Sequence, residues 1–280
     1  SDWSSDVCSS DLAEAVQAAI LMHDIGHAPF SHVLENTLIS GITHEEISLM
    51  MMDRINQDMH GALNLAISIF KDEYPKSYLH QLISSQLDMD RLDYLRRDSF
   101  FTGVTEGNIG SARIIKMLNV VNDALVVESN GIYSIENYLT SRRLMYWQVY
   151  LHKTTVGCEN VLINALRRAK QLAKEGVELF ASPSLRYFLY NDITAETFHT
   201  DNKALDNYIA LDDNDIWSAI KVWQQHEDKI LSLLSSNMIN RKIFKVEVRE
   251  EEPTTEEINK FKQLISERYE ISLADCDYLI

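Results

Sequence analysis

A histidine and an aspartate stand side by side in the run His-Asp-Ile-Gly-His-Ala-Pro-Phe-Ser-His over residues 23–32. An imidazole nitrogen and a carboxylate oxygen from adjacent residues can bind the same divalent metal ion. The alternative is that each histidine of this run is a hydrogen-bonded polar group at a helix end. Because one block combines three histidines with Asp24, Gly26 and Pro29, we favour His23 and Asp24 as metal ligands.

Two further histidines follow the pair at spacings that suit a turn between helices. His27 is four residues after His23 and stays near the same helix face if the helix continues. Gly26 weakens such a helix, whereas Pro29 fits the first turn of a new one. We therefore expect His27 and His32 at a helix-to-helix corner, facing the group that the metal holds.

A second cluster of charged side chains occurs in the run Asp-Met-Asp-Arg-Leu-Asp-Tyr-Leu-Arg-Arg-Asp over residues 88–98. On a helix, Asp90, Tyr94 and Asp98 stand at i, i+4 and i+8 and share one face, beside Arg97. A solvent-exposed charged face is one explanation, and an inward-facing functional stripe is the other. The segment by itself does not separate the two.

A long helical pattern over residues 135–173 carries cations and phenols on one face. The residues that recur at spacings of three and four are Arg142, Tyr146, Tyr150, Lys153 and Gly157. Guanidinium and ammonium groups beside phenols suit a wall that binds phosphates and a sugar. A surface stripe of amphipathic side chains is an equally good interpretation.

Helices dominate the elements that must position these groups. An apolar helix over 13–25 leads into the metal pair. Thr43 and Glu46 have the spacing of a capping box, which places His44 and Glu45 in the first turn of the next helix. The sequence further predicts helices over 63–70, 78–87, 108–121 and 206–236, a short helix opened by Pro183, and a β-hairpin over 124–135 with Asn130-Gly131 as its turn.

The two ends of the chain differ in character from its centre. Residues 1–12 are rich in serine and aspartate and lack helical periodicity, so we interpret them as a non-native segment joined to a natural helix. Near the other end, the sequence predicts a strand over 242–248, an amphipathic helix over 254–268 and the start of a strand over 277–280. We expect an incomplete β-α-β subdomain over 241–280 and a chain truncated at both ends.

The composition excludes several classes of protein. Twenty-six basic and 42 acidic residues give a net charge of −16, which argues against nucleic-acid binding through a basic surface. Three widely spaced cysteines do not suit a disulfide scaffold, and no apolar run is long enough to span a membrane. We expect a cytoplasmic protein in which a local cluster of Arg and Lys, or a metal ion, binds any anionic substrate.

In this order, the blocks HDIGHAPFSH, THEE, DMDRLDYLRRD, RRLMYWQVYLHK and NRKIFKV resemble those of the HD-domain phosphohydrolases, above all the deoxynucleoside triphosphate (dNTP) triphosphohydrolases. The resemblance covers roughly residues 14–250. It implies a mainly α fold, with an HD-domain helical bundle over 13–123 and a small β-hairpin plus helical substrate wall over 124–240. The start of a C-terminal α/β subdomain would follow over 241–280.

The resemblance also implies a role for each matching position. The ligands of one divalent ion (Mn, Mg, Fe or Zn) would be His23, Asp24 and Asp90. The phosphate-cleavage site would be lined by His27, His32 and His44, with His32 as the general acid and Glu35 orienting it. Phosphate contacts would come from Arg91, Tyr94, Arg142 and Lys153. Asp98 would hold the sugar 3′-hydroxyl, and Tyr150 would crowd the 2′ position and so select deoxyribose.

One position departs from the family pattern, which has a further metal-binding histidine on the helix before the His-Asp pair. No histidine precedes His23 in this sequence. We therefore expect three of the four family ligands here, and weakened metal binding and activity.

The expected reaction is hydrolysis of a dNTP to a deoxynucleoside and inorganic triphosphate. The alternatives are another HD-type nucleotide phosphoesterase and a catalytically degenerate nucleotide-binding regulatory module. The family resemblance also implies a homo-oligomer, a dimer or tetramer, with nucleotide effectors. The sequence ranks neither the four dNTPs nor the candidate metals.

Overall fold

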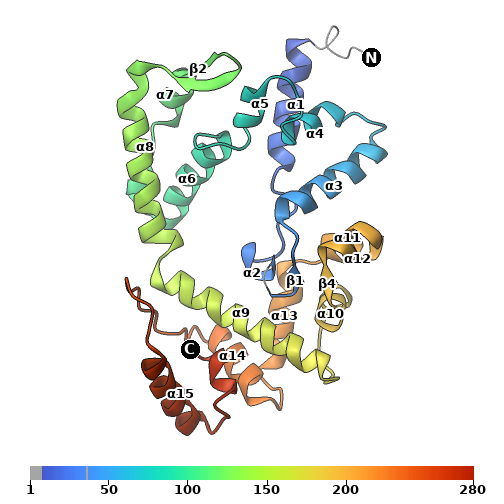
Figure 1. Ribbon diagram of the computed structural model, residues 1–280, viewed down its shortest axis with the longest axis vertical. Helices are drawn as coiled ribbons and strands as arrows, with labels where there is room; N and C mark the ends of the chain where they lie inside the picture. Colours follow the sequence, from blue (N-terminus) through green and yellow to red (C-terminus); the bar gives the residue numbers. More distant parts are fainter. Residues whose placement is uncertain (1–7, 36) are drawn as a thin grey trace. The chain divides into compact units, whose positions relative to one another are not determined.

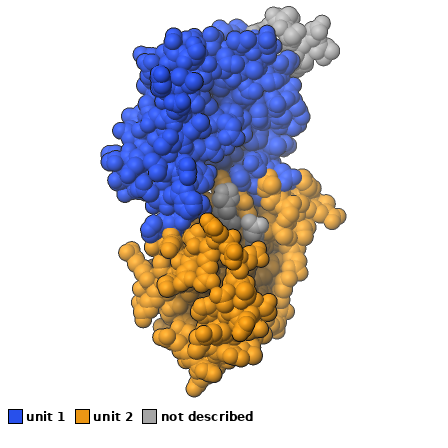
Figure 2. Space-filling view, turned by 60° about the vertical axis from the view of Figure 1, so that its left-hand side comes forward, with its two compact units in different colours: residues 1–26, 44–152 blue, residues 27–43, 153–280 orange. Residues whose placement is uncertain are grey.

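The computed structural model describes residues 8–35 and 37–280, apart from the side chain of His32. The fold is mainly helical, as predicted, with two small two-stranded sheets among the described residues. The chain forms two compact units, which Figure 2 shows in different colours. Unit 1 comprises residues 1–26 and 44–152, and unit 2 comprises residues 27–43 and 153–280.

Unit 1 contains seven of the described α-helices (Figure 1). They are α1 (Ser9–Met22), α3 (His44–Asp58), α4 (Asn64–Phe70), α5 (Ser77–Gln81), α6 (Met89–Thr102), α7 (Ser111–Lys116) and α8 (Ile132–Met145). One core cluster joins α1 to α4 through Ala15, Ala19, Ala66 and Ile69, because small side chains let two helices approach closely. A second core cluster is formed by buried residues of α6, α7 and α8 and of the segment before α7.

The start of α1 differs from the prediction. We expected a non-native segment over 1–12 and a helix from Ala13, but the helix begins at Ser9. Asp11 bonds back to the backbone N–H of Cys8, which helps to cap this end. Residues 1–7 lie outside the described part of the structure.

The predicted hairpin exists, but its register was wrong. Strand β2 (Leu118–Val121) pairs antiparallel with β3 (Ala124–Val127), and the turn is Asn122-Asp123. Both turn residues have positive φ, as a two-residue hairpin turn requires. Consequently the predicted helix over 108–121 shrinks to α7, and Asn130-Gly131 belongs to a 3₁₀ turn, Ser129–Gly131, that leads directly into α8.

The single long helix predicted over 135–173 was also wrong. Helix α8 passes into a π-helical turn, Tyr146–Tyr150, and helical geometry is lost at Leu151. A wide π turn rotates the following residues away from an α-helical register. A new helix, α9 (Lys153–Lys174), begins in unit 2, so Arg142 and Lys153 do not share one continuous helix face.

Unit 2 is built around α9. Its other helices are α2 (His32–Glu35), α10 (Pro183–Tyr190), α11 (Ala195–Thr200), α12 (Asn202–Ile209), α13 (Asp213–Trp223), α14 (Lys229–Ile239) and α15 (Thr255–Tyr269). Buried residues of α9 and α14 include Leu162, Leu166, Leu231 and Leu234. A short parallel pair joins β1 (Ile39–Ser40) to β4 (Ile193–Thr194). Pro183 and Thr254 open their helices as predicted.

The predicted strands of the C-terminal β-α-β subdomain were wrong. Residues 242–248 are irregular, and residues 275–278 form a 3₁₀ turn, η4 (Asp275–Tyr278). A strand needs a partner for its backbone groups, and no described segment pairs with either stretch. Within the described residues none of the helices is long and apolar enough for a membrane span. All three cysteines carry free thiols.

Candidate metal and phosphate site

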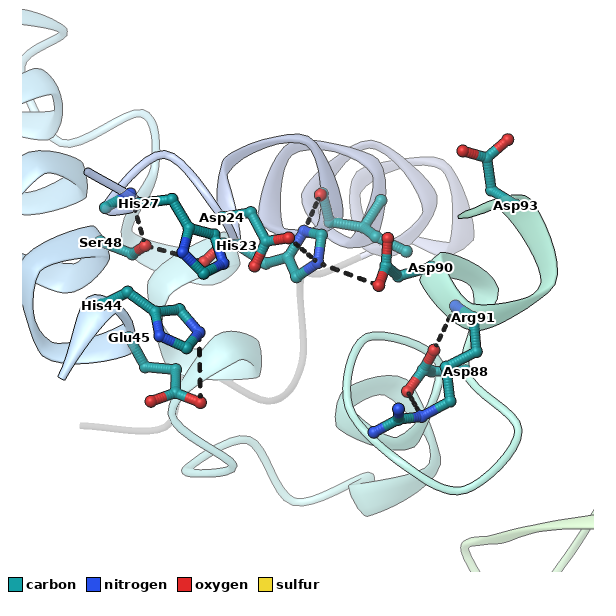
Figure 3. A network of polar contacts seen from close by, with 12 residues as sticks. His23, Asp24, His27, His44, Glu45, Ser48, Asp88, Asp90, Arg91 and Asp93 are labelled. Atoms are coloured by element: carbon teal, nitrogen blue, oxygen red, sulfur yellow. Dashed lines mark hydrogen bonds and ion pairs between the residues drawn. The ribbon is translucent and has the colours of Figure 1, made fainter. Parts of the chain in front are cut away.

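Three predicted metal ligands meet in unit 1 (Figure 3). His23 follows the last residue of α1, Asp24 is next in the chain, and Asp90 comes from the first turn of α6. His23 Nε2 lies 3.3 Å from Asp24 Oδ2 and 3.8 Å from Asp90 Oδ2. One ligand atom from each residue lies within 4.8 Å of the others. One imidazole nitrogen and two carboxylate oxygens thus converge on one point.

The second nitrogen of His23 is held by the backbone. Nδ1 lies 2.6 Å from the carbonyl oxygen of Ile20, so Nδ1 carries a proton and donates it there. This contact leaves Nε2 pointing at the two carboxylates, which is how metal-binding histidines are usually oriented. The donor set therefore fits a divalent cation such as Mn, Mg, Fe or Zn.

The electrostatics of the cluster favour a positive charge at its centre. The Asp90 carboxylate, helped by Asp24, raises the pKa of His23 to about 8 despite partial burial. The same contact holds the pKa of Asp90 below its usual value. Two carboxylates facing one imidazole nitrogen thus stabilise a cation, which a bound metal ion would supply in place of the proton.

Ser48 of α3 holds the turn that carries His23 and Asp24, and no motif or spacing in the sequence singled it out. Its buried hydroxyl donates to the carbonyl oxygen of His23 at 2.8 Å and accepts from the N–H of Gly26 at 2.9 Å. A Cβ atom on Gly26 would lie only 2.1 Å from the His44 carbonyl oxygen. Gly26 is therefore required by the close approach of this turn to α3.

His44 is the first residue of α3 and directly follows Thr43, so it lies in the first turn of this helix as predicted. Its Nε2 is 3.6 Å from a carboxylate oxygen of Glu45, the next residue. The His44 side chain is largely buried, whereas Glu45 is mostly exposed. Glu45 was not among the predicted site residues, although it belongs to the quoted Thr-His-Glu-Glu block.

Helix α6 resolves the ambiguity of the charged run over 88–98. Leu92 and Leu95 are buried in the core, and Asp90, Tyr94 and Asp98 are half-buried on another face. The Tyr150 hydroxyl donates a 2.7 Å hydrogen bond to Asp98 Oδ2, and burial together with this carboxylate raises the pKa of Tyr150. The stripe is therefore a half-buried polar face rather than a solvated one.

Two arginines of unit 1 stand near this face with fixed geometry. Arg91 Nε donates to the Ser85 carbonyl oxygen at 2.8 Å and lies 3.0 Å from a carboxylate oxygen of buried Asp88. Asp88 also accepts from the backbone N–H of Arg91 at 2.7 Å and so caps α6. Both of these side-chain contacts of Arg91 are therefore made through its Nε atom.

Arg142 is held from α8. Its Nη1 donates to Gln86 Oε1 at 3.1 Å, and its guanidinium lies 5.8 Å from the ring centre of Tyr146. The Tyr146 ring packs edge-on against Tyr150 at 5.2 Å, and Tyr150 packs in the same way against Tyr94 at 6.1 Å. The predicted stripe of Arg142, Tyr146 and Tyr150 thus lies in one aromatic cluster of unit 1.

The remaining predicted residues belong to unit 2. His27 Nδ1 is 3.8 Å from a carboxylate oxygen of Glu35, and both side chains are largely buried. The side chain of His32, the predicted general acid, lies outside the described part of the structure. Lys153 is exposed at the first residue of α9.

Backbone strain accompanies the corner between His27 and α2. Phe30 and Ser31 both adopt a positive φ, 57° and 50°, which costs free energy for non-glycine residues. The N–H of Ser31 bonds the Ala28 carbonyl oxygen at 2.9 Å, and the Phe30 ring packs edge-on against Trp217 at 5.6 Å. These contacts hold the predicted helix-to-helix corner, but the new helix begins at His32 and not at Pro29.

Two family patterns match the chain. The HD domain matches residues 9–98, and the HD associated region matches residues 109–181. A phosphohydrolase from Bacteroides thetaiotaomicron, known from a crystal structure, is 64% identical in sequence and superposes with a TM-score of 0.94. The match covers 98% of this chain and 68% of the chain in that crystal structure. The chain belongs to the HD-domain phosphohydrolases, a family of metal-dependent hydrolases.

Among curated relatives, the uncharacterized protein YwfO of Bacillus subtilis is 34% identical over 238 residues, which are 82% of this chain and 52% of YwfO. A deoxynucleoside triphosphate triphosphohydrolase SAMHD1 homolog of Dictyostelium discoideum is 28% identical over 177 residues. That match spans 57% of this chain and 34% of the relative. The chain thus spans about half or less of the length of these curated relatives.

Proposed function

We propose that the protein hydrolyses deoxynucleoside triphosphates to a deoxynucleoside and inorganic triphosphate. The observation that carries the proposal is the face of α6, which bears Asp90 of the metal cluster and, two turns later, Asp98 bonded to Tyr150. These positions are about 12 Å apart along the helix. A phosphate at one end and a sugar at the other fit that spacing. The relative named a dNTP triphosphohydrolase adds support.

The residues at the metal end suit cleavage at the α-phosphorus. A divalent ion bound by His23, Asp24 and Asp90 would lower the pKa of a water and polarise the phosphoryl group. The bond that breaks joins phosphorus to the 5′ oxygen of the sugar. His32 would protonate the departing oxygen, with Glu35 orienting it, and His27 and His44 would line the cleavage site.

The other residues would bind the triphosphate and select the sugar. Arg91, Arg142 and Lys153 would neutralise the phosphates in a chain of net charge −16, and Tyr94 would contact them from α6. Asp98 would accept a hydrogen bond from the 3′-hydroxyl. Tyr150, held against Asp98, would leave no room for a 2′-hydroxyl.

Two other functions remain as alternatives. Another HD-type nucleotide phosphoesterase would share the cluster of His23, Asp24 and Asp90, but the polar face that continues along α6 favours a substrate longer than a monophosphate. A degenerate regulatory module would bind nucleotide without turnover. We also propose a cytoplasmic homo-oligomer with nucleotide effectors, from the family resemblance.

Product analysis separates these functions. The protein is incubated with Mn²⁺ and each of the four dNTPs, and products are followed by ion-exchange chromatography and ³¹P nuclear magnetic resonance. The proposal expects deoxynucleoside and triphosphate in equal amounts. Release of pyrophosphate or orthophosphate without triphosphate contradicts it and favours another phosphoesterase. Saturable dNTP binding without any product favours the regulatory module.

A further inference from the structure

The turn directly before α6, here named the 85–88 turn, contacts two of the arginines proposed for the phosphates. Hydrogen bonds within the turn fix its shape. The Ser85 N–H donates to Asp88 Oδ2 at 3.0 Å, and the Leu87 N–H donates to Ser85 Oγ at 3.1 Å. Arg91 lies on α6 and Arg142 on α8, and all of these residues belong to unit 1. One fixed turn is therefore a shared neighbour of two cations that the proposed function uses.

Asp88 is a buried carboxylate with a second role besides capping α6. Only 3% of the residue is exposed. Its Oδ1 accepts the cap hydrogen bond from the Arg91 N–H at 2.7 Å, whereas its Oδ2 lies 3.0 Å from Arg91 Nε (Figure 3). A neutral side chain is enough for a cap, since Ser182 and Thr254 cap α10 and α15. The charge of Asp88 therefore serves its pair with Arg91 rather than the helix end.

This pair holds Arg91 by one edge of its guanidinium. Nε also donates to the Ser85 carbonyl oxygen at 2.8 Å, so two oxygen atoms of the 85–88 turn meet the same nitrogen. The remaining N–H donors of an arginine are on its terminal nitrogens, and the Tyr94 side chain hydrogen-bonds the guanidinium as well. Terminal nitrogens in one plane can bind phosphate in a bidentate way that a lysine cannot reproduce. Arg91 is thus ordered before a phosphate binds.

Gln86 makes the corresponding contacts with α8. Its backbone carbonyl oxygen accepts from the Tyr138 hydroxyl at 2.8 Å, and its Oε1 accepts from Arg142 Nη1 at 3.1 Å. Tyr138 is only 1% exposed, so the first contact anchors the turn to the core of unit 1. Tyr138 and Arg142 are four residues apart and share one face of α8. The second contact therefore orients Arg142 from the same turn that holds Arg91.

We propose that the 85–88 turn positions both arginines for a polyphosphate chain, with Asp88 acting through Arg91 and Gln86 acting through Arg142. Asp88 and Gln86 are positioning residues, because neither is assigned a contact with the substrate. Ordering a long side chain during binding costs free energy, and the turn removes this cost in advance. The inference rests on the proposed function, since it explains how that site recognises the phosphates of its substrate.

A double-mutant cycle tests whether Asp88 acts through Arg91. D88N keeps a capping side chain of the same shape but removes the charge, and R91K keeps a cation but lacks the guanidinium. Isothermal titration calorimetry with inorganic triphosphate at constant Mg²⁺ measures the affinity without any cleavage. We expect D88N to raise the Kd about tenfold in the wild-type background. In the R91K background we expect a change of less than about twofold, because the effects of contacting residues are not additive.

Gln86 is tested in the same way, and each pair serves as a control for the other. We expect Q86A to raise the Kd about threefold, less than D88N does, because an exposed neutral acceptor is lost. This effect should disappear in the R142K background. D88N should keep its effect of about tenfold in R142K, because Asp88 pairs with Arg91.

D228N is the matched structural control. Asp228 caps α14 and pairs with Arg168 in unit 2, and its side chain is 15% exposed. D228N therefore alters the same kind of cap and charge pair, and we expect it to leave the triphosphate affinity unchanged. Circular dichroism and the melting temperature report that each variant is folded. In ¹⁵N nuclear magnetic resonance spectra, the Arg91 Nε–H signal, assigned by its absence in R91K, should exchange with solvent faster in D88N than in D228N.

Three results overturn the proposal. The first is a wild-type protein that does not bind inorganic triphosphate. The second is an unchanged Kd in D88N and Q86A. The third is an effect of these variants that is as large in the R91K and R142K backgrounds as in the wild type, since the turn would then act only on the fold. Failure of the proposed function is seen separately, because a protein with the expected cycles that releases no triphosphate from dNTPs keeps the positioning role and loses the proposed reaction.

Discussion

The Tyr150 hydroxyl donates a 2.7 Å hydrogen bond to Asp98 Oδ2, and the two residues are 52 positions apart in the sequence. Asp98 lies on α6, and Tyr150 ends the π turn after α8. The bond fixes the phenol beside the carboxylate that we propose for the sugar 3′-hydroxyl. It also explains how a tyrosine on a non-α-helical turn can act as a rigid wall.

Two substitutions at Tyr150 test the role of its hydrogen bond and the role of its ring in sugar selection separately. We expect Y150F to lower kcat/KM for dNTPs about tenfold, because one hydrogen bond that orients Asp98 is lost while the ring remains. We expect Y150A to raise the ratio of ribonucleotide to deoxyribonucleotide turnover about tenfold, because space opens at the 2′ position. Y146F is the control, since its hydroxyl is not assigned a contact with the sugar. An unchanged ratio in Y150A contradicts the proposed selection.

The proposed metal ligands can be tested by measuring metal affinity alone, without an assay of turnover. We expect D90N to weaken Mn²⁺ binding about 100-fold, because a neutral amide replaces a charged ligand opposite His23. D93N is the matched control on the same helix, since Asp93 is mostly exposed and pairs with Arg97. Isothermal titration calorimetry of the metal-free protein measures both affinities. Equal affinities for the two variants exclude Asp90 as a ligand.

Gly26 tests the packing that holds the metal pair. We expect G26A to lower the free energy of unfolding by about 3 kcal/mol, because its Cβ overlaps the His44 carbonyl oxygen and forces α3 away. G110A is the control, since no atom lies within 4 Å of a Cβ at Gly110, and its change stays within about 0.5 kcal/mol. Urea denaturation followed by circular dichroism measures both. A G26A protein as stable as G110A contradicts this account of the turn.

The buried position of Lys170 on α9 leads to a prediction of how the free energy of unfolding depends on pH. Its ammonium group donates to the carbonyl oxygens of Phe188 and Asn191 at 2.5 and 2.7 Å, and burial lowers its pKa from 10.5 to about 8. Between these values the unfolded chain binds more protons than the folded chain, so the contribution of Lys170 to the free energy of unfolding rises with pH.

The variant K170M isolates that contribution from those of other groups. We expect the unfolding free energy of the wild type, minus that of K170M, to increase from pH 8 to pH 10.5 and to be flat between pH 6 and 7.5. Urea denaturation at each pH gives the two curves. A difference that falls above pH 8 excludes a lowered pKa for Lys170.

Much of the fold followed from local signals in the sequence. The Thr254 cap and Pro183 start their helices where expected, since capping and fixed φ depend on neighbours in the chain. The spacing of Asp90, Tyr94 and Asp98 on a helix was correct for the same reason. The metal pair His23-Asp24 needed only adjacent residues, and Asp90 joins it in space.

Other features arise only where distant segments meet. The hairpin uses Asn122-Asp123 rather than Asn130-Gly131, because strand register depends on which residues pair and pack across the ladder. The π turn that separates Arg142 from Lys153 leaves no mark in the periodicity of the sequence. The strands predicted near the C-terminus lack a described partner, and a strand cannot form alone.

The sequence by itself therefore indicated His23, Asp24 and Asp90 as candidate metal ligands at the end of one helix and the start of another, because residue type and helical spacing are local properties. Tertiary structure alone decided that Ser48 holds the turn after α1, that Asp98 bonds Tyr150, and that Leu139 of α8 stays exposed. The two hydrogen bonds join residues 25 and 52 positions apart in the sequence. The exposure of a helix face depends on which other segments pack against it. Such relationships are set by packing of the whole unit, which no local pattern encodes.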